Sequence, residues 1–252
     1  MNEGSHGASR PLAPRAGAGA VAAFLDAASL DAARRHPPAV DDGAPRLVFA
    51  LDATMSRQPT WDLACRVQAG MFEAAADAAG GGQGLRVQLV YFRGFAECAA
   101  SRFVADPRAL TGLMGKVSCR GGHTQIGRVL RHVRDVHRTE ALRTFVLVGD
   151  AMEERLDDLC AVAGELGLLG IKGFLFHEGD DPVAVGAFRE IARLTGGVAA
   201  RFDAAAPGTL AALLRAAAAY AARGVEGLRL QAGGSAEARR LLTAMGAKME
   251  AK

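Results

Sequence analysis

Short apolar runs alternate with longer amphipathic segments along most of this chain, and that alternation predicts the fold. Each apolar run is bounded by polar residues or glycine, which is typical of a strand buried on both faces of a parallel sheet. Predicted strands cover residues 47–51, 85–92, 144–148, 171–176 and 198–202, with a short edge strand over 98–104. Predicted helices cover residues 59–79, 106–117, 125–139, 153–168, 182–194 and 207–222. Because helices separate the strands, we expect an α/β fold with a doubly wound, mostly parallel sheet and helices on both faces.

The N-terminal region lies outside this alternation. Residues 1–18 are rich in Gly, Ser, Ala and Pro and are expected to be disordered. Residues 20–36 place apolar side chains at helical spacing, which predicts a short amphipathic helix that ends before Pro37. We expect this helix to pack on the main domain, and docking onto a partner is the alternative.

The C-terminal region continues the pattern only weakly. Residues 228–230 predict a short strand and residues 236–249 a polar helix, so we expect a peripheral tail. The chain then divides into residues 1–45 (a disordered N-terminus with one short helix and a linker), a domain over residues 46–223 and a tail over residues 224–252.

Composition narrows the class of protein. Of the 252 residues, 50% are hydrophobic and 23% charged, so the chain can bury a sizeable core. The net charge is only +3 and the arginines are scattered among acidic residues, so no nucleic-acid partner is expected. No stretch approaches the ~18 uncharged apolar residues that span a bilayer, so no membrane association is expected. The cysteines lack C-x-x-C spacing, which disfavours a zinc site or disulfides and favours the reducing cytoplasm: Cys65, Cys98, Cys119 and Cys160.

Candidate chemistry begins where the first predicted strand ends. Asp52 follows that strand directly, and two hydroxyl side chains follow at alternate positions, Thr54 and Ser56. Pro59 then suits the first turn of a helix, because its missing N–H would have no intrahelical partner there. The three polar residues therefore occupy a loop at the carboxyl edge of the sheet, where open α/β sheets bind ligands.

Two further loops carry polar groups to the same edge. Thr124 follows Gly121-Gly122-His123 at the start of a predicted helix, and Asp150 follows the apolar strand over 144–148. With the first loop they offer two carboxylates and three hydroxyls. These hard oxygen donors suit Mg²⁺ or Mn²⁺ and disfavour zinc. A cation held mostly by neutral hydroxyls would attract an Asp or Glu from a partner protein.

The order of these residues resembles the metal-ion-dependent adhesion site (MIDAS) of von Willebrand factor A domains, whose pattern is Asp-x-Ser-x-Ser, a distant Thr and a distant Asp. The resemblance covers residues 46–222 and implies a Rossmann-like, three-layer fold. The run Phe188–Gly197, which ends in Thr-Gly-Gly, resembles the family's helix before the last strand. This chain departs from the pattern at Thr54, where serine is usual, and at Ala151, where glycine is usual.

The resemblance implies a function. Within the family, the run from Asp52 to Asp62 is similar to small stand-alone bacterial members. It implies a non-catalytic, Mg²⁺-dependent protein-interaction module, with the metal on Asp52, Thr54, Ser56, Thr124 and Asp150. Partners implied by the family include AAA+ ATPases and stress-response complexes such as tellurite-resistance systems.

Two other functions compete with this hypothesis. Asp52 and Asp150 also resemble the first and last motifs of haloacid-dehalogenase-type phosphohydrolases, with Asp52 as the nucleophile and Lys116 as the phosphate-binding lysine. Against that enzyme, Thr54 stands where most such hydrolases place a second Asp as general acid/base. The third hypothesis is a structural subunit whose metal site stays empty.

Three residues near the predicted site are candidates for the rim that contacts a partner. Arg57 follows Ser56 and could pair with an acidic group, although a solvated arginine is the simpler interpretation. His123 precedes Thr124 and could contact a partner or simply face water. Trp61 could rim the site or pack the first helix against the N-terminal segment, and a largely buried tryptophan is the commoner case.

Overall fold

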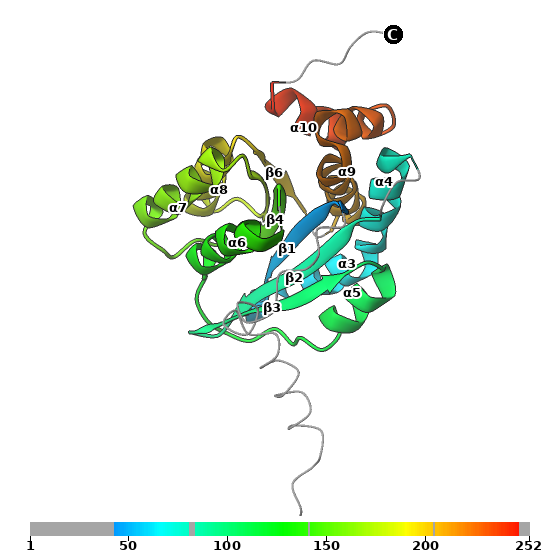
Figure 1. The fold of residues 1–252 in the computed structure, drawn as a ribbon. Helices are drawn as coiled ribbons and strands as arrows, with labels where there is room; N and C mark the ends of the chain where they lie inside the picture. Colours follow the sequence, from blue (N-terminus) through cyan, green and yellow to red (C-terminus); the bar gives the residue numbers. More distant parts are fainter. Residues whose placement is uncertain (1–42, 81–83, 141, 204, 247–252) are drawn as a thin grey trace, which may run out of the picture.

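The computed structural model describes residues 43–80, 84–140, 142–203 and 205–246. Its strands form one sheet in the order β3-β2-β1-β4-β5-β6 (Figure 1). They are β1 (Arg46–Asp52), β2 (Arg86–Arg93), β3 (Glu97–Val104), β4 (Thr144–Gly149), β5 (Lys172–Glu178) and β6 (Val198–Phe202). Neighbouring strands are parallel except for the antiparallel pair β2–β3 at one edge. The predicted doubly wound, mostly parallel sheet with an edge strand over residues 98–104 is therefore confirmed.

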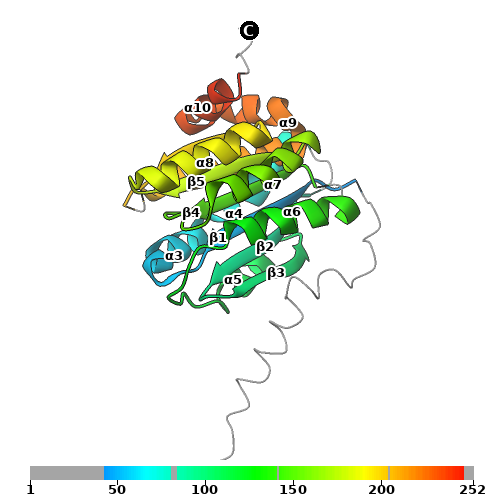
Figure 2. The same cartoon turned by 90° about the vertical axis from the view of Figure 1, so that its left-hand side faces the viewer.

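Helices cover both faces of this sheet. A short 3-10 helix η1 (Met55–Arg57) is followed by α3 (Gln58–Val67), α4 (Ala69–Ala79), α5 (Pro107–Met114), α6 (Ile126–Glu140), α7 (Leu156–Leu168), α8 (Pro182–Thr195), α9 (Pro207–Ala232) and α10 (Ala236–Ala244). Strand side chains alternate between the two faces, so two cores form. Phe49 of β1 packs in the core with α3, α4, α5 and α9, whereas Val48 and Ala50 pack with α6, α7 and α8. Figures 1 and 2 show these two helical layers on opposite faces of the sheet.

The helix predicted over residues 59–79 is two helices that meet at Gln68. The Gln68 side chain is buried, and its amide donates to Pro107 O at 3.0 Å and to Thr111 Oγ1 at 2.6 Å. At this point the backbone tightens, because the N–H of Met71 donates to Gln68 O, three residues earlier. A glutamine at the junction thus ties the α3–α4 segment to α5.

The C-terminal segment differs most from its prediction. The strand expected over residues 228–230 is wrong, because this segment is the second half of α9. Non-helical backbone at Arg223 and Gly224 breaks the helix, and Gly227 then packs closely on Ala219 O. Leu228 is buried in the same core as β1, together with side chains of α10. Residues 224–246 of the expected peripheral tail therefore belong to the packed helical layer.

Two expectations fall outside the described residues: the disordered segment over 1–18 and the amphipathic helix over 20–36. Across the part of the chain that is described, no helix combines the length and apolar character needed to cross a membrane.

Candidate metal centre

The candidate centre lies where the strand order reverses. β1 ends at Asp52, and its neighbour β4 ends at Gly149, one residue before Asp150. From β1 the chain proceeds to β2 on one side and later to β4 on the other, so the loops after β1 and β4 diverge from this point. Such a switch point forms a crevice at the carboxyl ends of the strands. Two residues that are far apart in the sequence thereby become neighbours.

Asp52 is a buried carboxylate whose loop is folded back onto it. Its side chain accepts a hydrogen bond from the backbone N–H of Thr54 at 2.7 Å, and only 3% of the residue is exposed. Burial raises the pKa of Asp52 to about 6, and the nearby charge of Asp150 acts in the same direction. The hydrogen bonds from Thr54 and the charge of Arg57 oppose this rise in pKa but do not cancel it. A divalent cation would stabilise the ionised form.

The hydroxyl groups connect this loop to Asp150. Thr54 Oγ1 lies 3.5 Å from Ser56 Oγ, and Ser56 Oγ donates to Asp150 Oδ2 at 3.4 Å. Asp150 Oδ1 is buried and has no hydrogen-bond partner among the residues that the structure describes. Neighbouring ligands of an octahedral Mg²⁺ lie about 3 Å apart, given metal–oxygen bonds of about 2.1 Å. The oxygens of Thr54, Ser56 and Asp150 therefore have spacings close to those of a cation site, and Asp52 is held on the same loop by the Thr54 N–H.

Thr124 is connected to the loop after Asp150 by Glu153, a residue that was not among the predicted site residues. The Thr124 N–H donates to Glu153 Oε2 and the Glu153 N–H donates to Thr124 Oγ1, both at 3.0 Å. This pair of hydrogen bonds holds Thr124 against the loop that follows Asp150. The next residue, Glu154, accepts from the N–H of Gly127 at 2.9 Å at the start of α6, and burial raises its pKa.

Of the three predicted rim residues, only His123 is exposed. Its side chain is 61% exposed and lies 3.1 Å from Glu153 Oε2. Trp61 is 2% exposed, packs edge-on against Tyr91 and donates from Nε1 to Met114 O at 3.2 Å, so its placement on the rim is wrong. The side chain faces inward because Trp61 lies on the face of α3 that packs on the sheet.

Arg57 is also buried, within the centre and not on its rim. It is 7% exposed, and its guanidinium lies between the carboxylates of Asp150 and Glu178. Glu178 was not predicted, although one signal was present: it ends a strand at the same edge of the sheet. Gly149 pairs with His177 in the register of β4 and β5, so the residues that follow each, Asp150 and Glu178, are neighbours.

Two exposed apolar side chains lie next to predicted site residues, one after β1 and one in the turn after β2. Met55 is 63% exposed and Phe95, in the turn between β2 and β3, is 79% exposed. The Phe95 ring stacks edge-on with His123, with centroids 5.2 Å apart. Gly122 packs so closely on this turn that a Cβ there would lie 2.0 Å from Gly94 O. Sequence reasoning missed Met55 and Phe95 because exposure cannot be read from residue type.

The donor set fits a cation held by few carboxylates. Across the described residues no group of three or more His, Cys, Asp or Glu side chains is placed to hold a metal ion. Asp52 and Asp150 are the two carboxylates among the five predicted ligands, and Glu178 is paired with Arg57, so a cation here would need hydroxyl ligands and water or a partner's oxygen. That donor chemistry suits a hard divalent ion.

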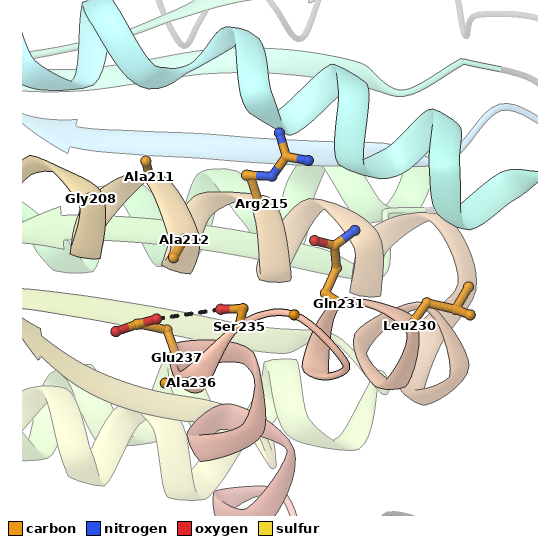
Figure 3. Close-up of a pocket in the computed structure, with 10 residues that line it drawn as sticks. Gly208, Ala211, Ala212, Arg215, Leu230, Gln231, Ser235, Ala236 and Glu237 are labelled. Atoms are coloured by element: carbon orange, nitrogen blue, oxygen red, sulfur yellow. Dashed lines mark hydrogen bonds between the residues drawn. The ribbon is translucent and has the colours of Figure 1, made fainter. Parts of the chain in front are cut away.

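A hollow lies elsewhere, between the two halves of α9 and the start of α10 (Figure 3). Its volume is about 480 Å³, and Gly208 and Ser235 are among its lining residues. Arg215 lines it but points toward α4, where it pairs with Glu73 at 2.8 Å. Among the described residues that line this hollow, Arg215 is the one cationic side chain, and Glu73 already neutralises it, so we assign the hollow no binding site.

Comparisons with known proteins bear on the fold. No protein-family model matches the sequence, and no curated protein matches it. Solved structures do match, among them a von Willebrand factor type A protein from Catenulispora acidiphila, at 20% identity and a TM-score of 0.56. The match covers 71% of this chain and 43% of that chain, so this chain spans less than half the length of that relative.

Two other solved structures have the same fold. The SpRpn10 VWA domain matches at 9% identity and a TM-score of 0.53, over 66% of this chain and 95% of that one. Proximal thread matrix protein 1 from the mussel byssus, solved with a zinc-occupied MIDAS motif, matches at 18% identity and a TM-score of 0.52. That match covers 71% of this chain and 47% of the mussel chain. With the six-stranded sheet and its antiparallel edge, these matches establish that the chain has the von Willebrand factor A fold.

Proposed function

We propose that this chain is a non-catalytic protein-interaction module in which a divalent cation joins the protein to a carboxylate of a partner. One observation carries the proposal: a buried oxygen of Asp150, Oδ1, lacks a hydrogen-bond partner in the described chain, while its Oδ2 lies 3.4 Å from Ser56 Oγ. Leaving a buried carboxylate oxygen without a donor costs free energy, and a bound cation would remove that cost.

Five residues would hold the cation: Asp52, Thr54, Ser56, Thr124 and Asp150. Two carboxylates balance the charge of a divalent ion, and three neutral hydroxyls leave it attractive to an anionic ligand. When bound, the ion would supply a positive charge that attracts a partner's Asp or Glu, whose carboxylate would complete the ion's coordination shell. Oxygen donors favour Mg²⁺ or Mn²⁺. Because the mussel byssus protein has a zinc-occupied MIDAS motif, Zn²⁺ belongs in the same test.

The partner would also contact the exposed side chains beside the centre. Met55, Phe95 and His123 offer two apolar groups and an imidazole on one edge of the sheet. Exposed apolar groups of this kind mark interaction surfaces, and aromatic residues often contribute most to binding. A matching partner segment has an acidic residue next to an apolar one. By family resemblance, an AAA+ ATPase or a bacterial stress-response complex is the candidate partner class. Four free cysteines agree with a cytoplasmic setting for this role.

Calorimetric titration with Mg²⁺ tests the cation. The double variant Asp52→Ala, Asp150→Ala is expected to lose binding altogether, because both charged ligands are removed. The control is Asp157→Ala, which deletes an exposed carboxylate in the first turn of α7 and should leave the affinity unchanged. Equal Mg²⁺ affinity in the double variant and wild type would refute the site.

An affinity pull-down with and without EDTA tests the bridging role. A partner that is lost both with EDTA and with Asp52→Ala supports the metal bridge. A partner retained in both lanes rules the bridge out. If wild type binds no cation, the hypothesis of a structural subunit with an empty site is favoured.

The non-catalytic part of the proposal is tested separately. Thr54 stands where a phosphohydrolase would need its general acid/base, and Lys116 is an exposed residue after α5. We expect wild type to hydrolyse aryl phosphates no faster than Asp52→Asn does. Hydrolysis by wild type that Asp52→Asn abolishes would establish the enzyme instead.

A further inference from the structure

Arg57 lies inside the candidate centre, where a buried guanidinium is unexpected beside a cation site. Its Nη1 ion-pairs with Glu178 and also donates to Thr60 Oγ1 at 3.4 Å. Its Nη2 donates to Ser56 O at 3.2 Å. The Thr60 hydroxyl also donates to Glu178. These contacts anchor the guanidinium on the Glu178 side of the centre.

The contact between Arg57 and Asp150 is weaker than the contact between Arg57 and Glu178. Arg57 Nε lies 3.2 Å from Asp150 Oδ2, within ion-pair distance, but Nε makes no hydrogen bond to any residue that the structure describes. Ser56 Oγ reaches the same oxygen at 3.4 Å. The attraction to Asp150 therefore lacks the alignment that makes charge-assisted hydrogen bonds strong. This is the contact that can separate most easily.

The charges around Arg57 have a simple balance. Three carboxylates surround the single guanidinium: Asp52, Asp150 and Glu178. Arg57 neutralises one of them, and the remaining two match the charge of one divalent cation. A cation on Asp150 would nevertheless lie close to the guanidinium. Like charges a few ångströms apart in a partly buried site repel strongly, because little water screens them.

We propose that Arg57 is a built-in competitor for the cation at Asp150, and that Glu178 holds the guanidinium when a cation binds. The inference rests on the proposed cation site. It means that Arg57 sets the cation concentration at which the centre fills. Without Arg57 the centre would fill at lower cation concentration, and without Glu178 the guanidinium would rest on Asp150 and exclude the cation more strongly.

Calorimetry with Mg²⁺ on the full chain tests this competition through single substitutions. Arg57→Gln removes the charge and is expected to tighten Mg²⁺ binding by about tenfold or more, since a repulsive unit charge is lost. Arg57→Lys keeps the charge and should bind Mg²⁺ about as wild type does. Arg66→Gln removes an exposed charge from α3, the helix that follows Arg57, and is the matched control. Glu178→Gln should weaken Mg²⁺ binding.

Each outcome separates the competition from the cation site itself. If wild type binds Mg²⁺ and Arg57→Gln binds equally or more weakly, the competition is refuted while the site stands. If only Arg57→Gln binds Mg²⁺, the competition is supported and the proposed function of wild type fails. If neither binds, both are refuted. Should Arg57→Gln fail to fold by circular dichroism, Glu178→Gln decides, and unchanged or tighter Mg²⁺ binding there refutes the competition.

Discussion

At the scale of single residues, His177 shows how burial sets a pH response. His177 directly precedes Glu178 in β5 and is 5% exposed. Its ring lies edge-on to Phe188, with centroids 6.2 Å apart. Burial lowers the pKa of His177, and the charges of Arg189 and Arg201 lower it further. The folded protein therefore keeps this imidazole neutral at pH values where the unfolded chain already protonates it.

His177 should make stability fall on acidification. As pH drops below the unfolded pKa of about 6.5, only the unfolded state gains the proton, so the free energy of unfolding decreases. The loss is at most about 1.4 kcal/mol for each pH unit, down to the lowered folded pKa. Urea unfolding of wild type and His177→Gln from about pH 5 to pH 8 measures it. His177→Gln should show a smaller slope with pH, and identical slopes would contradict the prediction.

Single residues also show how much of the candidate site could be predicted from the sequence. Asp52 and Asp150 were identifiable because each directly follows an apolar strand, and parallel strands end at one edge. The burial of Arg57 and Trp61 could not be predicted, because it depends on the 3-10 turn and on how α3 is rotated against the sheet. Glu178 was missed because its importance comes from the pairing of β4 with β5.

At the scale of elements, the end of α8 explains the Thr-Gly-Gly run. Gly196 adopts φ +60° at the C-cap, where left-handed backbone favours glycine. A Cβ on Gly197 would lie 1.9 Å from Gly173 O, so the chain passes directly against β5. Thr195 accepts a hydrogen bond from the Gly173 N–H at 3.3 Å. The helix end was predictable from glycine alone, but the close approach depends on a strand distant in sequence.

Gly197→Ala should therefore destabilise the fold. The added methyl meets backbone, which cannot move aside as a flexible side chain can, and the expected loss is roughly 3 kcal/mol. Gly186→Ala is the matched control, because Gly186 lies exposed inside α8 with open space around its Cβ position. That substitution should stabilise by about 0.5–1 kcal/mol. Chemical denaturation measures both, and a neutral Gly197→Ala would contradict the close approach.

At the scale of the whole molecule, the alternation of strands and helices was enough to predict the doubly wound sheet. It was not enough for the C-terminal segment. Leu228 and Leu230 alternate with Arg229 as in a strand, but three residues cannot distinguish a strand from a helix. In the folded chain Leu228 and Ala232 lie one helical turn apart and are buried, while Leu230 is 57% exposed. Packing on the sheet decided what local pattern could not.

Cation binding should be coupled to global stability, because the centre exists only in the folded sheet. Mg²⁺ at one hundred times its Kd should add about 2.7 kcal/mol to the free energy of unfolding. Asp52→Asn should lose this gain. In EDTA at neutral pH the same variant should be more stable than wild type by about 1–3 kcal/mol, because burial raises the pKa of Asp52 to about 6. Urea unfolding with Mg²⁺ or EDTA measures both effects, and a Mg²⁺ gain retained in Asp52→Asn would contradict the coupling.

The position of the centre between β1 and β4 has a consequence during protein synthesis. Ser56 leaves the ribosome 94 residues before Asp150, a delay of about 5–20 s at ordinary rates of translation. Glu178 follows later still. A nascent chain that has folded only β1 and β2 therefore exposes Asp52 without the groups that complete its surroundings. On the proposed function, the centre would recruit a cation or a partner only after β4 has joined the sheet, so recognition at this site would exclude nascent chains in which only β1 and β2 have folded.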